Sequence, residues 1–166
     1  MPKPKLRARL ITLAAAAVLI ALDRWLKSRV AIHLEPLAQM EVWPGVVGLR
    51  FTRNTGISFS LFGDSRMIMH VISVVTALVM LAGIVALLLG KIGGTVPLSA
   101  AALILAGGLG NLIDRLMNGY VVDYIELLFT RFAIFNFADI CITCGVALAV
   151  AWVIWSEVRQ RKKAKA

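Results

Sequence analysis

The sequence predicts a mainly α-helical membrane protein with four transmembrane helices and a small extracytoplasmic β-sheet cradle at the outer rim of the bilayer. Of the 166 residues, 60% are apolar and 16% are charged, and the mean hydropathy is +0.84. A soluble domain of this length cannot bury so much apolar surface. Four apolar stretches reach the length of about 20 residues that crosses a bilayer, and two segments between them are rich in β-branched and aromatic residues. We therefore expect a single integral membrane domain over residues 1–166.

The four expected spans cover residues 10–26, 67–90, 96–116 and 137–158, each bounded by charge, Gly or Pro. The first also resembles a secretory signal peptide, because basic residues precede its apolar run. A cleavage site of small residues should then follow, but Asp23, Arg24 and Trp25 stand there. We therefore interpret this stretch as an uncleaved span.

Residues 27–66 and 117–136 form the two expected outer segments. The first contains an alternating stretch at 46–53, with a Pro-Gly pair before it and Asn-Thr-Gly after it. The second contains β-branched and aromatic runs at 120–125 and 132–135. Such runs between turn residues predict strands, so we expect a small sheet on the outer membrane surface.

The distribution of charge predicts the orientation and the partners. The net charge is +9, but Lys and Arg crowd the first nine and the last eight residues, and eight of the nine acidic residues fall on the other side of the expected membrane. Positive charge gathers on the cytoplasmic side of membrane proteins, so we expect both termini to be cytoplasmic. Basic tails beside apolar runs suit anionic lipid. We therefore expect membrane lipid as a partner and no nucleic acid.

The polar side chains of the expected spans lie at one depth. A charged side chain inside a span costs at least about 2.5–3.5 kcal/mol on insertion scales, so each one needs a reason. Successive spans run in opposite directions, yet all of these residues fall at the outer ends, close to two further polar residues of the outer segments. The full set is Asp23, Lys27, Asn54, Asn111, Asp114, Arg115, Asp123, Asn136 and Asp139. We expect them to form one site.

Several of these residues also fit structural roles. Asp23 and Lys27 have the spacing and order of a helical ion pair, and a structural pair is the favoured interpretation. Arg115 is expected to neutralise its neighbour Asp114. Three glycines of the third span allow close helix packing, and they are Gly107, Gly108 and Gly110. Two alternatives stay open.

In the first of these alternatives, Asn136 only caps the fourth span and Asp139 lies in its first helical turn. In the second, Asp123 is only a turn residue.

Carboxylates are the chemical groups that remain once other chemistries are considered. His33 and His70 are isolated, which argues against a metal centre, and the Cys141/Cys144 pair lies inside the fourth span, away from any redox fold. We expect neither a metal nor a cofactor. Two carboxylates held close together share a proton, because one pKa rises.

Such a pair can hydrolyse an amide when one member activates water and the other donates to the carbonyl oxygen. Asp123 and Asp139 are the expected pair. The alternative is a small proton-coupled membrane transporter, because intramembrane acids mark proton relays. Transporter acids, however, lie near the middle of the bilayer, whereas these lie at one rim.

At these residues the chain resembles bacterial lipoprotein signal peptidase, also called signal peptidase II. Five motifs occur in the order and at the spacing of that family. They are Asp23-x-x-x-Lys27; Asn54-x-Gly56-x-Ser58-Phe59; Gly107-x-x-Gly110-Asn111-Leu112-x-Asp114-Arg115; Gly119-x-Val121-x-Asp123-Tyr124; and Phe135-Asn136-x-Ala138-Asp139.

The resemblance implies an aspartyl endopeptidase of the bacterial inner membrane, with its active site near the periplasmic face. Its substrates would be prolipoproteins with a diacylglyceryl-modified cysteine, and the signal peptide would be cut off just before that cysteine. Asp123 and Asp139 would be catalytic. The substrate or the catalytic pair would be held by Asn54, Gly56, Asn111, Arg115 and Asn136. Asp23, Lys27 and Asp114 would support the outer rim, and we expect the enzyme to be a monomer.

Overall fold

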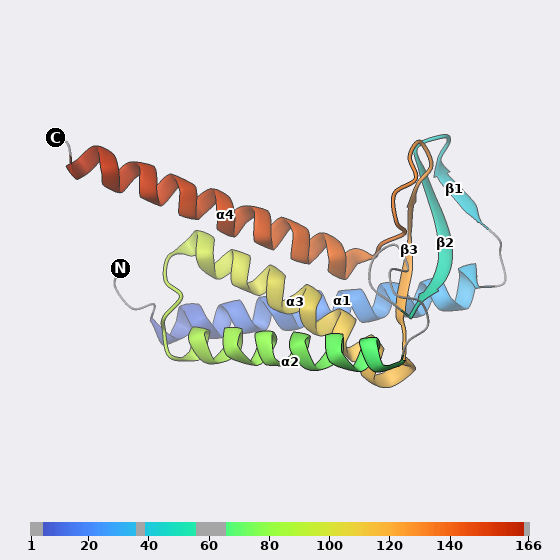
Figure 1. Cartoon of the computed structure of the whole chain (residues 1–166), viewed down its shortest axis with the longest axis horizontal. Helices are drawn as coiled ribbons and strands as arrows, with labels where there is room; N and C mark the ends of the chain where they lie inside the picture. The colour runs from blue at the N-terminus through green and yellow to red at the C-terminus, as the bar shows by residue number, and fades with distance from the viewer. Residues whose placement is uncertain (1–4, 36–38, 56–65, 165–166) are drawn as a thin grey trace.

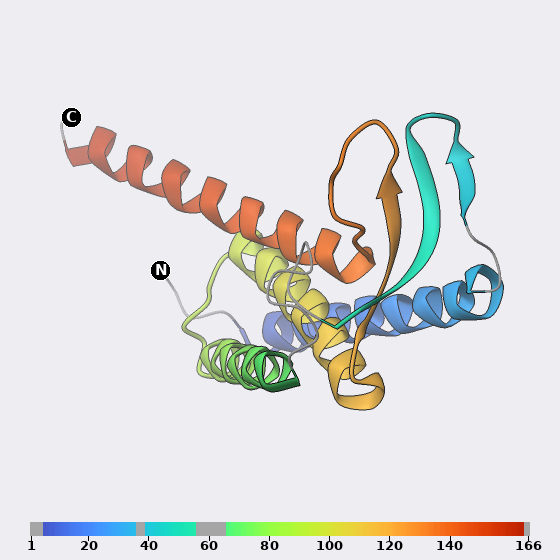
Figure 2. The same cartoon turned by 45° about the vertical axis from the view of Figure 1, so that its right-hand side comes forward.

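The computed structural model describes residues 5–35, 39–55 and 66–164. Four long helices pack together, and a small sheet stands at one end of the bundle (Figure 1). The helices are α1 (Leu6–Leu34), α2 (Arg66–Leu88), α3 (Thr95–Asn118) and α4 (Phe137–Ala164). The helix α2 crosses α1 and α4 at an angle (Figure 2). The start of α1, the α2–α3 connection and the end of α4 all lie at the end away from the sheet (Figure 1).

Three helical segments are long and apolar enough to cross a membrane: Met67–Leu88, Thr95–Asn118 and Phe137–Lys163. They coincide with the second, third and fourth expected spans. The helix α1 is not among them, because charged residues interrupt its apolar run. The predicted mainly helical fold is therefore confirmed, and three of the four predicted spans have the length and apolar composition needed to cross a membrane.

The helix α1 extends further than expected. Residues 27–34 were assigned to an outer segment, but they continue the helix as far as Leu34. Val30 and Leu34 are buried against Val122 and Tyr124 of the sheet. The spacing of these two residues, four positions apart, places them on one apolar face of the helix that packs on the sheet.

The predicted sheet is present, with three antiparallel strands in the order β1-β2-β3. The strands are β1 (Met40–Trp43), β2 (Val47–Asn54) and β3 (Val121–Leu127). The two strands expected around 46–53 and 120–125 pair from Val47↔Leu127 to Asn54↔Val121. The edge strand β1 was not predicted, and the run at 132–135 forms only an isolated bridge between Ile125 and Phe135.

Two turns of the chain bring distant polar residues to the same end of the bundle. Gly119 has a φ of 75°, a left-handed conformation that glycine adopts at little cost, and it ends α3 just before β3. After β3 the chain loops back beside that strand and enters α4 (Figure 2). The return is fixed where Ile125 N–H donates to Phe135 O at 2.8 Å and Phe135 N–H donates to Ile125 O at 3.1 Å. As a result α4 begins next to the middle of β3.

The glycines of α3 lie at close helix contacts. A Cβ at Gly107 would overlap the carbonyl oxygen of Ala138 on α4 and lie 3.0 Å from the backbone nitrogen of Ile142. A Cβ at Gly110 would lie 2.7 Å from Asp23 Oδ2, and one at Gly108 would overlap Met80. Small residues therefore let α3 pack closely against its three neighbouring helices, as expected for helices in a membrane.

We expect Gly107→Ala to lower the stability of the folded protein by about 1–3 kcal/mol, since the new methyl group forces α3 away from the α4 backbone. Gly83→Ala on α2 is the matched control. Its Cβ would have its nearest contact at 3.4 Å, with Leu105 Cδ2, so it should be neutral or stabilising by up to about 1 kcal/mol. Thermal unfolding in detergent measures both variants. Equal midpoints for the two would contradict the close contact.

Candidate active site

A buried ion cluster joins α1 to α3 near the sheet. Lys27 Nζ lies 2.9 Å from Asp23 Oδ2 and 2.9 Å from Asp114 Oδ2, and Arg24 forms a further ion pair with Asp114. Asp23, Lys27 and Asp114 are each at most 2% exposed. Two acids face two bases, so the cluster carries no net charge. A buried charge is tolerated when it is paired in this way.

The expected Asp23–Lys27 ion pair is present, but the expected partner of Asp114 was wrong. Asp114 pairs with Arg24 and Lys27 of α1, whereas Arg115 lines a cavity together with Asp123 and Asp139. The sequence predicts no partner for Arg24. Its partner lies 90 positions away along the chain, so no local spacing could have identified the pair.

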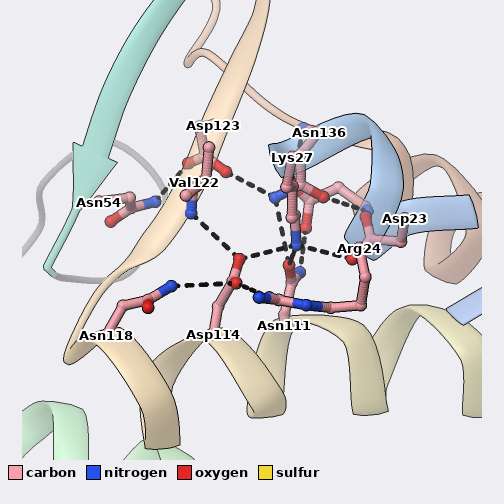
Figure 3. Close-up of polar contacts among 11 residues, drawn as sticks. Asp23, Arg24, Lys27, Asn54, Asn111, Asp114, Asn118, Val122, Asp123 and Asn136 are labelled. Carbon is pink, nitrogen blue, oxygen red and sulfur yellow. Dashed lines mark hydrogen bonds and ion pairs between the residues drawn. The ribbon is translucent and has the colours of Figure 1, made fainter. Parts of the chain in front are cut away.

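Asp123 lies in the middle of β3, which excludes the alternative that it is a turn residue. Its side chain is buried. Asn54 Nδ2, at the end of β2, donates to Asp123 Oδ2 at 2.8 Å, and Asn136 Nδ2 donates to Asp123 Oδ1 at 2.6 Å (Figure 3). Both carboxyl oxygens therefore accept a hydrogen bond from an amide.

Asp139 lies in the first turn of α4. Asn111 Nδ2 donates to Asp139 Oδ1 at 2.7 Å, and the Asn136 backbone N–H donates to Asp139 Oδ2 at 3.1 Å. In return, the Asp139 backbone N–H donates to Asn136 Oδ1 at 3.0 Å. This is a reciprocal cap of the helix. The capping role of Asn136 is thus present, and the same side chain also reaches Asp123.

Asn111 connects the carboxylates to the ion cluster. Its Oδ1 accepts hydrogen bonds from Lys27 Nζ at 2.9 Å and from Asn136 Nδ2 at 3.1 Å (Figure 3). Its Nδ2 faces Asp139. One network therefore runs from the buried lysine through two asparagines to both carboxylates.

The two carboxylates line one cavity of about 490 Å³. Asn54, Asn111 and Arg115 contribute further charged and amide groups, and the rest of its wall is mostly apolar. The remaining lining residues are Ile72, Val121, Leu127, Phe132, Ala133, Ile134, Phe135, Ile140, Ile142, Thr143 and Cys144. An apolar cavity with a few convergent polar groups is typical of a ligand site. The sequence did not predict that these residues line a site, because apolar residues carry no distinguishing signal in such a chain.

The structure thus brings together most of the residues expected to form the site. Asn54, Asn111, Arg115, Asp123 and Asp139 share the cavity, and Asn136 bridges them. Gly56 lies outside the described residues, as do Ser58 and Phe59 of the same motif.

Burial raises the pKa of Asp123 to about 6. The nearby charge of Asp139 acts in the same direction, whereas the hydrogen bonds from Asn54 and Asn136 and the charge of Lys27 act against it. Two carboxylates in one site resist ionising together, so once one of them has ionised the remaining proton is held more tightly. Asp123 can therefore keep its proton up to a pH of about 6, above the usual range of an aspartic acid.

Two carboxyl groups that line one cavity in a helix bundle, Asp123 buried and Asp139 half-buried, have the arrangement of an acid–base site of the aspartyl type. Comparison with known proteins identifies the family. The family model for signal peptidase (SPase) II matches residues 15–155, and the chain belongs to the signal peptidase II family.

Curated relatives and a solved structure agree with this membership. The lipoprotein signal peptidase of Streptococcus agalactiae is 37% identical over 140 residues, which cover 84% of this chain and 88% of the relative. That of Sphingopyxis alaskensis is 40% identical over 152 residues, covering 89% and 86%. A solved bacterial membrane enzyme has a TM-score of 0.79 at 26% identity and covers 89% of each chain.

The family membership confirms the predicted enzyme class, a peptidase that removes signal peptides from prolipoproteins. The alternative of a proton-coupled transporter finds no support in these comparisons.

Proposed function

We propose that Asp123 and Asp139 are the catalytic pair of this peptidase. We further propose that it cuts diacylglyceryl-modified prolipoproteins just before the lipidated cysteine. The observation that carries the proposal is the shared cavity, in which asparagine amides hold both carboxyl groups toward one space. Asn54, Asn111, Arg115 and Asn136 then hold the substrate or the pair, and we assign the same role to Gly56 by its motif.

In the proposed mechanism Asp123 carries the proton and Asp139 is ionised. Asp139 takes a proton from water while the water oxygen bonds to the scissile carbonyl carbon, and Asp123 gives its proton to the carbonyl oxygen. The C–N bond then breaks. The proton on Asp139 passes to the leaving nitrogen, and a hydroxyl proton of the intermediate returns to Asp123. Both carboxyl groups end in their starting states.

The walls of the cavity support entry of the substrate from within the bilayer. Ile72 of α2 and Ile140 of α4 both belong to its apolar lining. A second hollow of about 310 Å³ lies between α2, α3 and α4, with Met80, Ala101 and Trp152 among its lining residues. A signal-peptide helix can lie along these apolar surfaces while its lipid chains remain among the membrane lipids. Only the extended peptide at the cut then needs to reach the carboxylates.

The ion cluster supports α1 as a fourth span. At 1.5 Å per residue its 29 residues cover about 43 Å, enough to cross a bilayer. Its charges Asp23, Arg24 and Lys27 are paired with each other or with Asp114, which lowers the cost of placing them in the membrane. We place both termini in the cytoplasm and the sheet at the periplasmic face of the inner membrane, and we infer a monomer whose basic ends contact anionic lipid.

The test is cleavage by the purified protein in lipid nanodiscs. One prolipoprotein is supplied with and without the diacylglyceryl group, and the products are weighed by mass spectrometry. We expect a cut just before the cysteine, in the modified form alone. Equal cleavage of the unmodified form would refute the proposed substrate, and a different cut position would refute the proposed specificity.

The raised pKa of Asp123 predicts the pH dependence of cleavage. Asp123 must be protonated to donate to the carbonyl oxygen, so kcat/KM should decrease as the pH rises through about 6. The decrease should approach tenfold per pH unit well above this value. Initial rates between about pH 5 and about pH 8 measure it, with folding followed in parallel. A rate that is flat or rises over the whole range would contradict the assignment of the proton to Asp123.

A further inference from the structure

Lys27 is surrounded by three acceptors. Its ammonium group has three N–H donors and no acceptor. Lys27 Nζ donates a hydrogen bond to Asn111 Oδ1 at 2.9 Å and forms ion pairs with Asp23 Oδ2 and Asp114 Oδ2, each also at 2.9 Å. Because the side chain is 2% exposed, water does not substitute for these contacts.

The orientation of the Asn111 amide follows from these contacts. Its Oδ1 faces two donors, Lys27 Nζ and Asn136 Nδ2, while its Nδ2 faces a carboxylate oxygen of Asp139. A rotation by half a turn would place the NH₂ group against two donors and the carbonyl oxygen against a carboxylate. All three contacts would become repulsive in a buried site, where unmatched polar groups are costly.

Asn136 is oriented by the same principle but by a different group. Its Oδ1 faces the backbone N–H of Asp139, which can only donate. Its Nδ2 is therefore directed at Asp123. Asp139 thus receives the NH₂ group of Asn111, and Asp123 receives that of Asn136 in addition to that of Asn54. The Asn111 and Asn136 amides are each held by a donor at their other end.

We propose that Lys27 is a positioning residue that orients the Asn111 amide toward Asp139. This inference rests on the proposed function, because it matters for catalysis only if Asp139 is part of the catalytic pair. Lys27 lies behind Asn111 and is absent from the cavity lining found among residues 5–35, 39–55 and 66–164. It therefore does not touch the substrate. It acts through Asn111, and its charge also lowers the pKa of Asp123, so the orientation of the Asn111 amide is the property specific to the proposal.

The test compares Asp23→Asn with the double variant Asp23→Asn/Lys27→Met. The background change removes one acid, so loss of Lys27 leaves the Asp114–Arg24 pair balanced and spares the fold an unpaired buried charge. The chain has four asparagines, and selective ¹⁵N labelling resolves their side-chain NH₂ signals beside that of the introduced amide. We expect the Asn111 signal to be single in Asp23→Asn and to broaden or double once Lys27 is replaced. The Asn136 signal should stay single.

Cleavage kinetics give the second measurement. We expect kcat to fall about tenfold on replacing Lys27, the size of one hydrogen bond to a charged group, with KM unchanged. If Lys27 only stabilised the fold, the Asn111 signal would stay single in a double variant that remains folded. An unchanged signal, or an unchanged kcat, would overturn the proposal. A failure of the proposed function gives a different result. If Asp139 is not catalytic, the Asp139→Asn enzyme remains active, and the Asn111 side-chain signal still changes when Lys27 is replaced.

Discussion

Replacing either proposed catalytic carboxyl group by its amide is expected to slow cleavage of a lipidated prolipoprotein at least about a thousandfold. In Asp123→Asn the side chain cannot supply the proton that the carbonyl oxygen needs, and in Asp139→Asn it cannot take a proton from water. Both replacements keep the shape of the side chain. The Asp139→Asn side chain also keeps an oxygen that can cap α4. Single-turnover cleavage in nanodiscs, with enzyme in excess, measures the loss.

Glu126→Gln is the matched control for this experiment. Glu126 lies three residues after Asp123 on the same strand, and it pairs with Arg50 at 3.0 Å on the sheet. The Glu126→Gln substitution changes a carboxylate to an amide in the same strand but away from the cavity. We therefore expect its cleavage rate to be within about twofold of that of the unchanged enzyme. An Asp123→Asn or Asp139→Asn protein that cleaves as fast as Glu126→Gln would remove that residue from the catalytic pair.

Hydropathy predicted most of the fold because the membrane imposes a length and a composition on each span. The predictions differed from the structure in segments where the burial of a residue does not follow from its polarity. In α1, Lys27 is among the most deeply buried side chains although it is charged. All four residues of β1 are exposed, so the strand has no alternation of buried and exposed positions by which to recognise it.

The site was predictable as a set of residues but not as a network. Polar residues at one depth indicated that Asp123 and Asp139 would meet, and the bridge at Phe135 shows how the chain returns to allow it. The partners of Asp114 were not predictable, since Arg24 reaches it from another helix. The orientation of each amide was not predictable either, because it depends on which donors surround it in three dimensions.

Asp114→Ala is expected to destabilise the protein by about 3–5 kcal/mol, the cost of breaking a buried ion pair from one side. Asp114 is fully buried and holds three elements together. It pairs with Arg24 and Lys27 of α1, accepts from Asn118 of α3 at 3.3 Å, and accepts from the Val122 backbone N–H of β3 at 3.2 Å. Removing it leaves two cations and one backbone donor without this partner. Since folded proteins are stable by about 5–15 kcal/mol, thermal unfolding should show a large decrease.

Two comparisons separate burial from the mere presence of an ion pair. Glu157 and Arg161 form a pair at 3.6 Å on the exposed part of α4, and Glu157→Ala should cost at most about 0.5 kcal/mol because solvent screens such pairs. The double variant Asp114→Ala/Arg24→Met removes one charge of each sign and lacks the same hydrogen bonds as Asp114→Ala, so it should recover the part of the stability that unbalanced charge costs. If Asp114→Ala unfolds at the same temperature as Glu157→Ala, the buried cluster does not hold α1 to α3. If the double variant is no more stable than Asp114→Ala, the loss comes from the hydrogen bonds of Asp114 and not from unbalanced charge.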